Sequence, residues 1–397
     1  MLQYHARMNN PAPLPTIRLK SDRPPGHPWV WSAQIVKPEA KLPPGSLVEI
    51  VDSRQRFVGR GFWNGHARVA LRVLTGREDE AIDDAWIAER ISRAVAMRRD
   101  LLKLDEVSDA WRVIHSEGDS LSGLVVDRYA NHLVVEYFAA GMWRFRETIN
   151  AELLKHFPGS SLYWFAEQHV QRQESFDVRS NDAPEAMEVH EHGLRFHAAP
   201  GLGHKTGFFA DQRDNRRHFA ELAKGRRVLD LCCNAGGFAV HAMAAGALEA
   251  TGVDMDGAIL EVARANAAMN NITASFEQGD VFEWLRTAIE RGERYDAVVL
   301  DPPKLTRDRN QVMAALKKYF AMNRTAIDVI APGGILLTCS CTGLVGEEAF
   351  LEMLRRVALS AGRDIQVLHV AGAGPDHPVL ATVPEGRYLK AVFCRVS

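Results

Sequence analysis

The stretch Val228-Leu-Asp-Leu-Cys-Cys-Asn-Ala-Gly-Gly-Phe238 decides the fold of this chain. It starts as an apolar run typical of a buried strand, and its glycine pair permits a tight turn into a helix. Around it, strands are expected at 227–232, 249–254, 273–278, 295–300, 333–340 and 388–395. Helices are expected between them at 211–224, 237–246, 257–270, 280–292, 310–330 and 346–361. This alternation predicts a doubly wound α/β domain that binds its ligand at the carboxyl ends of its strands, with the last two strands antiparallel.

Upstream of this domain the pattern is different. Residues 1–13 form a polar tail, and short β-like segments interrupted by Gly and Pro extend from Ile17 to Thr75, which predicts a small β-barrel. A helix over 80–104, a hairpin turning at Tyr129-Ala-Asn-His132, a helix near 143–156, a strand at 161–165 and a loop over 174–188 predict a central, β-rich α+β unit. The expected division is therefore into residues 1–80, 81–195 and 196–397.

Composition and cysteine content are those of an ordinary globular protein. The 397 residues are 46% hydrophobic and 25% charged, without an apolar run of about 18 residues or a signal-peptide core, so a cytoplasmic location is expected. The five cysteines are odd in number, which favours reduced thiols over a disulfide framework. They show no Cys-x2-Cys spacing, and no metal site is expected.

Charge is unevenly distributed along the chain. Residues 1–75 carry eleven Lys and Arg against four acidic residues, a net charge of +7, whereas the whole chain has −2. A basic module on an acidic remainder is expected of a protein that contacts a phosphate backbone, so an RNA partner is predicted. The alternative is a solvated surface that happens to be basic.

A nucleotide-like cofactor is indicated by the turn and by acidic residues at strand ends. The turn residues are predicted to bind it through backbone groups at a helix N-terminus: Asn234, Ala235, Gly236, Gly237 and Phe238. Asp254 ends the next strand, where it can accept both ribose hydroxyls, and Asp280 can hold an adenine amino group. Gln212 and Arg213 begin the preceding helix, where Arg213 can pair with a carboxylate. Because Gly-x-Gly-x-x-Gly is absent, S-adenosylmethionine is predicted in preference to a dinucleotide.

Two further motifs suggest where the substrate is bound and attacked. Asp301-Pro302-Pro303-Lys304 closes a strand with a rigid turn that can engage the edge of a flipped base. Lys304 replaces the aromatic residue typical of adenine-N6 methylation. Cys339 and Cys341 end the following strand, and a thiolate there can attack C6 of a pyrimidine and make C5 nucleophilic. Buried, inert cysteines are the alternative interpretation.

Several longer motifs carry a family resemblance. They are His27-Pro-Trp-Val-Trp31, Glu117-Gly-Asp-Ser-Leu-Ser-Gly-Leu-Val-Val-Asp-Arg128, Lys205-Thr-Gly-Phe-Phe-Ala-Asp-Gln-Arg213, Asp301-Pro-Pro-Lys304, Ser340-Cys-Thr-Gly343 and Pro384-Glu-Gly-Arg-Tyr-Leu-Lys390. Together, over nearly the whole chain, they resemble the bacterial 23S rRNA cytosine-C5 methyltransferases. These combine an N-terminal PUA domain, a central β-rich domain and a Rossmann-like class I methyltransferase domain.

The resemblance implies S-adenosylmethionine as cofactor and 23S rRNA, free or in a ribosomal assembly particle, as partner. Its nucleophile lies seven residues past the Gly-Gly that begins the strand, which from Gly334 is Cys341. Asp301 then engages the cytosine together with Pro302, Pro303 and Lys304. A related group of RNA C5-methyltransferases has a cysteine where this chain has Lys304, which leaves Cys339 or a water to help release the product.

Other functions remain open at this point. The chain can be a methyltransferase for another RNA base or for a small molecule, or a non-catalytic RNA-binding assembly factor. The sequence does not identify the modified cytosine, and a homodimer is one of several oligomeric states it leaves open.

Overall fold

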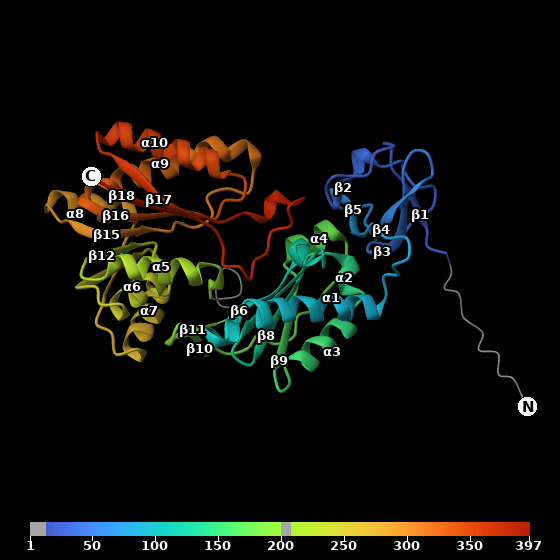
Figure 1. Cartoon of the computed structure of the whole chain (residues 1–397), viewed down its shortest axis with the longest axis horizontal. Coiled ribbons are helices and arrows are strands. Elements are labelled where there is room, and N and C mark those ends of the chain that lie inside the picture. The colour runs from blue at the N-terminus through green and yellow to red at the C-terminus, as the bar shows by residue number, and fades with distance from the viewer. Residues whose placement is uncertain (1–12, 200–207) are drawn as a thin grey trace, which may run out of the picture.

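The computed structural model describes residues 13–199 and 208–397, so the predicted tail at 1–13 lies almost wholly outside the described residues. Figure 1 shows a small β unit at one end, a large α/β unit at the other and an α+β unit between them. Within the described ranges, no helix combines the length and apolar character needed to cross a membrane.

The N-terminal unit is a five-stranded barrel, as predicted. Its strands are β1 (Thr16–Arg18), β2 (Trp29–Trp31), β3 (Ser46–Val51), β4 (Phe57–Trp63) and β5 (Val69–Thr75), in the order β1-β3-β4-β5-β2. A bridge between Leu19 and Ile35, just past β1 and β2, joins the two edges, so the sheet closes on itself. Alternate residues such as Val48 and Ile50 fill the interior, which is the period-two pattern of a half-buried strand.

The central unit combines a four-stranded sheet with four helices, of which α1 and α3 pack against each other. Its elements are α1 (Asp84–Ala96), β6 (Ala110–His115), β7 (Leu124–Tyr129), β8 (His132–Tyr137), α2 (Ala140–Trp143), α3 (Arg146–His156), β9 (Ser161–Phe165) and α4 (Gln168–Glu174). The sheet order is β6-β7-β8-β9, and Tyr129 pairs with His132 across the predicted hairpin turn. Asp83 caps α1 by accepting the backbone N–H of Trp86, which starts the helix four residues later than expected.

A short hairpin that the sequence analysis missed links this unit to the next. Strands β10 (Met187–Glu191) and β11 (Leu194–Ala198) turn at His192-Gly193, and the predicted boundary after residue 195 falls inside β11. Five-residue strands beside a polar stretch give a weak periodicity signal, which is why the loop was predicted to extend to residue 188 and no hairpin was predicted. The backbone N–H of Arg195 and of His197 donates to asparagine side chains of the α/β unit, so the hairpin packs against that unit.

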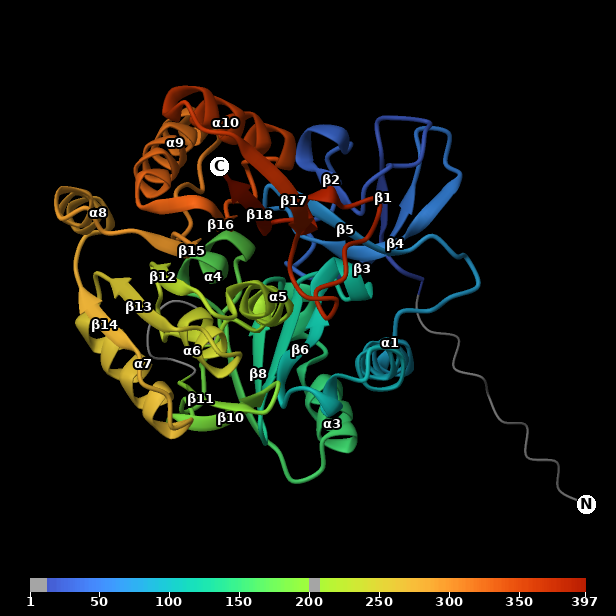
Figure 2. The same ribbon diagram turned by 60° about the vertical axis from the view of Figure 1, so that its left-hand side comes forward.

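The C-terminal unit is the predicted doubly wound domain. Its sheet has the order β14-β13-β12-β15-β16-β18-β17, formed by β12 (Arg227–Leu231), β13 (Glu249–Asp254), β14 (Ser275–Gln278), β15 (Tyr295–Leu300), β16 (Ile330–Ser340), β17 (Ile365–Ala371) and β18 (Lys390–Val396). One face carries α5 (Arg213–Ala223), α6 (Gly237–Ala244) and α7 (Gly257–Met269). The other carries α8 (Val281–Glu290), α9 (Val312–Asp328) and α10 (Glu347–Ala361), as Figure 2 shows.

The antiparallel pairing of the last two predicted strands is confirmed, because β16 pairs antiparallel with β18. A further strand, β17, pairs with β18 at the sheet edge and was not expected from the sequence. An edge strand buries little, and Val367 and Leu368 are about half exposed, so β17 lacks the apolar alternation that marks a strand in a sequence.

Two features of this fold position a site. The strand order reverses at β12, whose neighbours are β13 and β15, and this switch point is where open α/β sheets bind ligands. In addition, residues 372–389, between β17 and β18, extend from the large sheet toward the other two units (Figure 1). Asp376 in this segment contacts Arg98 and Arg112 of the central unit, and Glu385 contacts His27 of the barrel.

Candidate active site

The turn that follows β12 is strained and is held by an acidic residue of the next strand. Cys232, Asn234 and Gly236 all have positive φ, of 61°, 49° and 76°, and two of them are not glycine. Left-handed conformations at non-glycine residues are uncommon and cluster at functional sites. Asp254, at the end of β13, fixes the turn by accepting the backbone N–H of Asn234 at 2.9 Å, so the two predicted residues do lie together.

A cavity of about 460 Å³ opens at these strand ends. It brings together eight predicted residues, namely Gln212, Asn234, Asp254, Asp280, Asp301, Pro302, Pro303 and Cys341. Sequence reasoning missed its apolar walls, which include Met255, Ile259, Val281, Phe282, Leu305, Met322 and Leu389. Two of these, Met255 and Val281, directly follow the predicted Asp254 and Asp280, and that adjacency in the sequence was the available signal.

The two acidic residues at the strand ends each support a loop and border the cavity. Asp254 accepts the backbone N–H of Asp256 through its second oxygen at 3.1 Å. Asp280 caps α8 by accepting the N–H of Phe282 at 2.9 Å through Oδ1. Since a carboxylate offers about four acceptor positions, each retains capacity for a ligand donor.

The glycine pair serves packing more than ligand approach. A Cβ on Gly236 would lie 2.9 Å from the ring of Phe276, and a Cβ on Gly237 would lie 2.9 Å from Cδ of Arg216. Gly236 lines neither the cavity of about 460 Å³ nor the smaller space beside it. Three predicted residues, Ala235, Gly237 and Phe238, line an adjoining space of about 40 Å³ that shares Gln212, Asn234 and Asp301 with the larger cavity.

Arg213 does not lie where the sequence analysis expected a carboxylate partner. Its guanidinium is fully buried and donates to both oxygens of Asp376, at 3.0 and 3.3 Å, with Asp214 as a weaker neighbour. Arg213 does not line the cavity, and we withdraw it from the set of cofactor ligands. Asp376 is 163 residues away in the sequence, a separation that no local pattern could bridge.

Asp301 is positioned by the predicted helix start before β12. The amide Nε2 of Gln212 donates to Oδ2 of Asp301 at 2.9 Å, and Oε1 of Gln212 accepts from Asn215 at 2.6 Å. The backbone N–H of Asp301 donates to the carbonyl of Leu231, which ties the end of β15 to the end of β12. The predicted Gln212 and Asp301 are therefore direct partners.

A second cavity, of about 390 Å³, lies between the central unit and the α/β unit. Phe209, Asp211 and Cys341 line both cavities, whereas Lys304 lines only this one. Sequence reasoning missed its central-unit wall, formed by Arg112, Val125, Asp127, Glu136, Phe138, Glu167 and His169. Of these, only Val125 and Asp127 lie in a motif that had been singled out. Lys205, Thr206 and Gly207 of the nearby motif lie outside the described residues.

The two cysteines at the end of β16 have different surroundings. Cys339 is fully buried within the sheet, and this burial raises the pKa of its thiol well above the ordinary value. Cys341, directly after the strand, is partly exposed and borders both cavities. The two cysteines predicted at the end of one strand therefore differ, because Cys341 borders the cavities whereas Cys339 is buried in the sheet.

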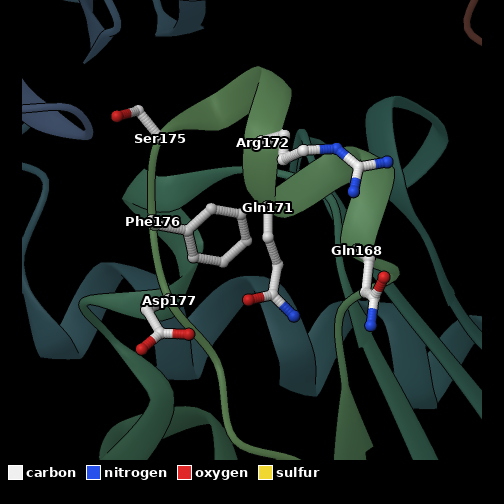
Figure 3. Close-up of a pocket in the computed structure, with 6 residues that line it drawn as sticks. All are labelled: Gln168, Gln171, Arg172, Ser175, Phe176 and Asp177. Atoms are coloured by element: carbon white, nitrogen blue, oxygen red, sulfur yellow. The ribbon is translucent and has the colours of Figure 1, made fainter.

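A further hollow of about 570 Å³ lies beside α4 and the segment that follows it (Figure 3). Its polar side chains do not converge on one point, and Gln171 is occupied by hydrogen bonds to the carbonyls of Ala166 and Val178. It shares no lining residue with the two cavities at the strand ends. We assign it no role in the site.

Comparison with known proteins agrees with this geometry. The family model described as S-adenosylmethionine-dependent methyltransferase matches residues 155–393, and the model of a PUA-like domain matches residues 25–76. The chain belongs to the S-adenosylmethionine-dependent methyltransferase family. The predictions of a class I methyltransferase domain, a PUA-like barrel and this cofactor are confirmed.

Individual relatives extend over nearly the whole chain. Ribosomal RNA large subunit methyltransferase I of Tolumonas auensis is 37% identical over 393 residues, which cover 96% of this chain and 99% of that protein. The protein of the same name from Erwinia tasmaniensis is 35% identical over 378 residues, covering 93% and 95%. Among solved structures, an S-adenosylmethionine-dependent methyltransferase from Streptococcus mutans shares the fold, with a TM-score of 0.80 and 18% identity over 96% of this chain and all of that one.

The residues of the first cavity fit this cofactor. Carboxylates stand at the ends of β13 and β14, where hydroxyl and amino groups of an adenosine need acceptors. Ile259, Val281 and Phe282 supply apolar surface for the adenine ring. The volume of about 460 Å³ lies within the ordinary range of small-molecule sites.

Proposed function

We propose that this protein methylates C5 of a cytosine in 23S rRNA through a covalent bond between Cys341 and C6 of the base. One observation carries the proposal, namely that Cys341 borders both the cofactor cavity and the cavity walled by the central unit. A nucleophile for this reaction must reach the base while the base faces the methyl donor. The names of the relatives, ribosomal RNA large subunit methyltransferase I, support rRNA as the substrate.

The cofactor supplies an electrophilic methyl group, and the residues of this chain orient it. Asp254 would accept hydrogen bonds from the two ribose hydroxyls, and Asp280 would accept one from the adenine amino group. The turn from Asn234 to Phe238 offers backbone N–H groups at the start of α6 to the methionyl carboxylate. Gln212 orients the carboxylate of Asp301 by donating a hydrogen bond to its Oδ2.

The cytosine lies between Cys341 and the Asp301-Pro302-Pro303-Lys304 turn. The Cys341 thiolate adds to C6, and the electron pair of the C5–C6 double bond makes C5 nucleophilic. C5 then takes the methyl group, a base removes the C5 proton, and the restored double bond expels the thiolate. Asp301 hydrogen-bonds the Watson–Crick edge of the base, which selects the ring that enters.

Trapping with modified RNA tests this reaction. RNA carrying 5-fluorocytosine should form a stable covalent adduct with the wild type, because fluorine replaces the proton that must leave. Cys341→Ala should lose the adduct and methylation yet retain cofactor binding. Cys339→Ala is the matched control and should keep the adduct, since that sulfur is fully buried. Loss of the adduct in Cys339→Ala alone would reassign the nucleophile. Methylation that survives both changes would end the C5 mechanism in favour of another base.

The N-terminal barrel offers basic side chains that an RNA backbone can contact. Arg18 and Lys20 on the barrel are exposed and have no carboxylate partner in the described part of the chain, so they are available to phosphates. We propose that this unit contributes RNA affinity and not chemistry, and that the protein acts in the cytoplasm on rRNA or an assembly particle. We also propose that the functional units follow the predicted division into residues 1–80, 81–195 and 196–397, except that the β10–β11 hairpin belongs with the last of them.

A further inference from the structure

Cys341 has surroundings that oppose the form in which it must react. The carboxylates of Asp211 and Asp301 line the same cavity as its sulfur. Two negative charges and partial burial both disfavour a thiolate, yet the thiolate is the nucleophile. The reaction set out above, on which this inference rests, is therefore favoured by a positive charge held close to this sulfur. Among the described residues, four other cations line the two cavities that Cys341 borders, but three are exposed and the fourth is paired with Asp127: Lys304, Arg307, Lys318 and Arg112.

Lys390 supplies a buried cation at this place. It is the first residue of β18, which pairs antiparallel with β16 so that Lys390 lies opposite Ser340. Its Nζ donates to the carbonyl of Thr342 and to the carbonyl of Tyr388, both at 2.9 Å. Only 3% of the residue is exposed. The ammonium is thereby held beside the backbone that immediately follows Cys341.

The charge of Lys390 has no close carboxylate partner. Within residues 13–199 and 208–397, its two hydrogen bonds go to neutral carbonyls, and no carboxylate oxygen pairs with its Nζ within 4.0 Å. An ammonium has three donors, so one remains after these two bonds. A buried cation without an anion is costly, and such groups are concentrated at functional sites.

The other charges around Lys390 are few and exposed. Glu347, at the start of α10, attracts it, but Glu347 is exposed and lies 4.0 Å from Arg387. Lys304, exposed at the rim of the second cavity, repels it. Burial lowers the pKa of Lys390 to about 8, although the attraction of Cys341 acts in the opposite direction and raises it. The lysine is therefore still largely protonated near neutral pH.

We propose that the buried ammonium of Lys390 stabilises the thiolate of Cys341 and so acts as a positioning residue for the nucleophile. The thiol proton leaves to water through the open cavity, and Lys390 keeps its own protons throughout. When sulfur bonds to C6 its charge passes to the ring, and when the adduct breaks the charge returns to sulfur beside the same ammonium. No proton passes between the two residues.

The pH dependence of thiol alkylation tests this pair without RNA or cofactor. The rate of Cys341 carbamidomethylation by iodoacetamide would be followed by peptide mass in the wild type, Lys390→Gln and Lys390→Arg. Gln keeps a donor for the two carbonyls but removes the charge, whereas Arg keeps the charge. The pH midpoint of the Cys341 alkylation rate should rise by about one unit or more in Lys390→Gln, because that is the usual effect of losing an opposite charge within ~4–6 Å. In Lys390→Arg the same midpoint should stay near the wild-type value. An unchanged midpoint in folded Lys390→Gln overturns the proposal.

The wild type alone provides a second measurement in case Lys390→Gln does not fold. A Cys341 midpoint at or above ~8.5, the ordinary value of a free cysteine, overturns the proposal, and a lower one supports it. The two experiments distinguish a failure of the proposed C5 methylation from a failure of the proposed role of Lys390. If 5-fluorocytosine traps no adduct but the midpoint shift is found, the charge pair stands without the C5 reaction. If the adduct forms and no shift is found, only the role of Lys390 is lost.

Discussion

Replacing Asp376 by asparagine should destabilise the protein strongly. Asp376 is wholly buried in the segment between β17 and β18, and its carboxylate accepts from both Nη atoms of Arg213 and from the backbone N–H of Arg112. Arg98 donates to its carbonyl at 2.7 Å. One residue therefore joins the long segment to the central unit and to α5.

The magnitude follows from what the change leaves behind. An asparagine at this position would keep the shape of the side chain but not its charge. The guanidinium of Arg213 would stay buried, with half-exposed Asp214 at 3.4 Å and the more distant Glu191 as its remaining acidic neighbours. Removing one partner of a buried ion pair costs about 3–5 kcal/mol. Because Asp214 retains some of the attraction, we expect the lower half of that range.

Denaturation in urea, followed by tryptophan fluorescence, measures the free energy of unfolding. Asp328→Asn is the matched control, because Asp328 forms an i,i+4 pair with Arg324 in which both side chains are about one-third exposed, and such pairs contribute about 0.3–0.5 kcal/mol. The free energies of unfolding of Asp376→Asn and of this control should differ by clearly more than about 1 kcal/mol. A smaller difference would fall well short of the cost of breaking a buried pair, and it would show that the buried network does not hold the units together as described.

The same pair has a pH signature with a defined sign. Burial raises the pKa of Asp376, but the His377 and Arg213 side chains outweigh it and hold this pKa below its ordinary value near 3.8. A depressed carboxyl pKa contributes stability above the unfolded-state value that is lost as pH falls below it. Wild type and Asp376→Asn should therefore converge in stability only below about pH 4, and convergence already at about pH 6 would contradict the assignment.

Three further outcomes are expected. Asp254→Ala should weaken S-adenosylmethionine binding in calorimetry by at least about tenfold, because two charge-assisted hydrogen bonds of about 1.5–3 kcal/mol each are lost, and unchanged affinity in a folded protein would contradict this. Burial and the Arg112 cation lower the pKa of His115 to about 2, so below pH ~6.5 only the unfolded state takes up this proton. Stability should then fall by about 1.4 kcal/mol per pH unit, and His115→Gln should show a shallower slope in acid titration. Exchanging Arg18 and Lys20 for serine should lower the salt slope of rRNA-fragment binding by about 0.7–0.9 per lost phosphate contact, and an unaltered slope would count against RNA contact at the barrel.

The sequence determined the parts of this protein that local patterns encode. Strand and helix periodicity gave the order of the α/β domain, and the turn after β12 with Asp254 indicated the cofactor cavity. The family resemblance, through the count of seven residues from Gly334, predicted Cys341 in preference to Cys339 as the nucleophile. The first two inferences were possible because they depend on periodicity within single elements and on the order of neighbouring strands, whose carboxyl ends meet at one edge of a parallel sheet.

Only the tertiary structure decided which distant side chains meet. It assigned Arg213 to Asp376, it brought the central-unit side chains to face Cys341, and it placed the ammonium of Lys390 beside the end of β16. Each of these contacts depends on how separate elements pack, which periodicity does not record. The exposed edge strand β17 was missed for a related reason, because a strand that buries little leaves little pattern in the sequence.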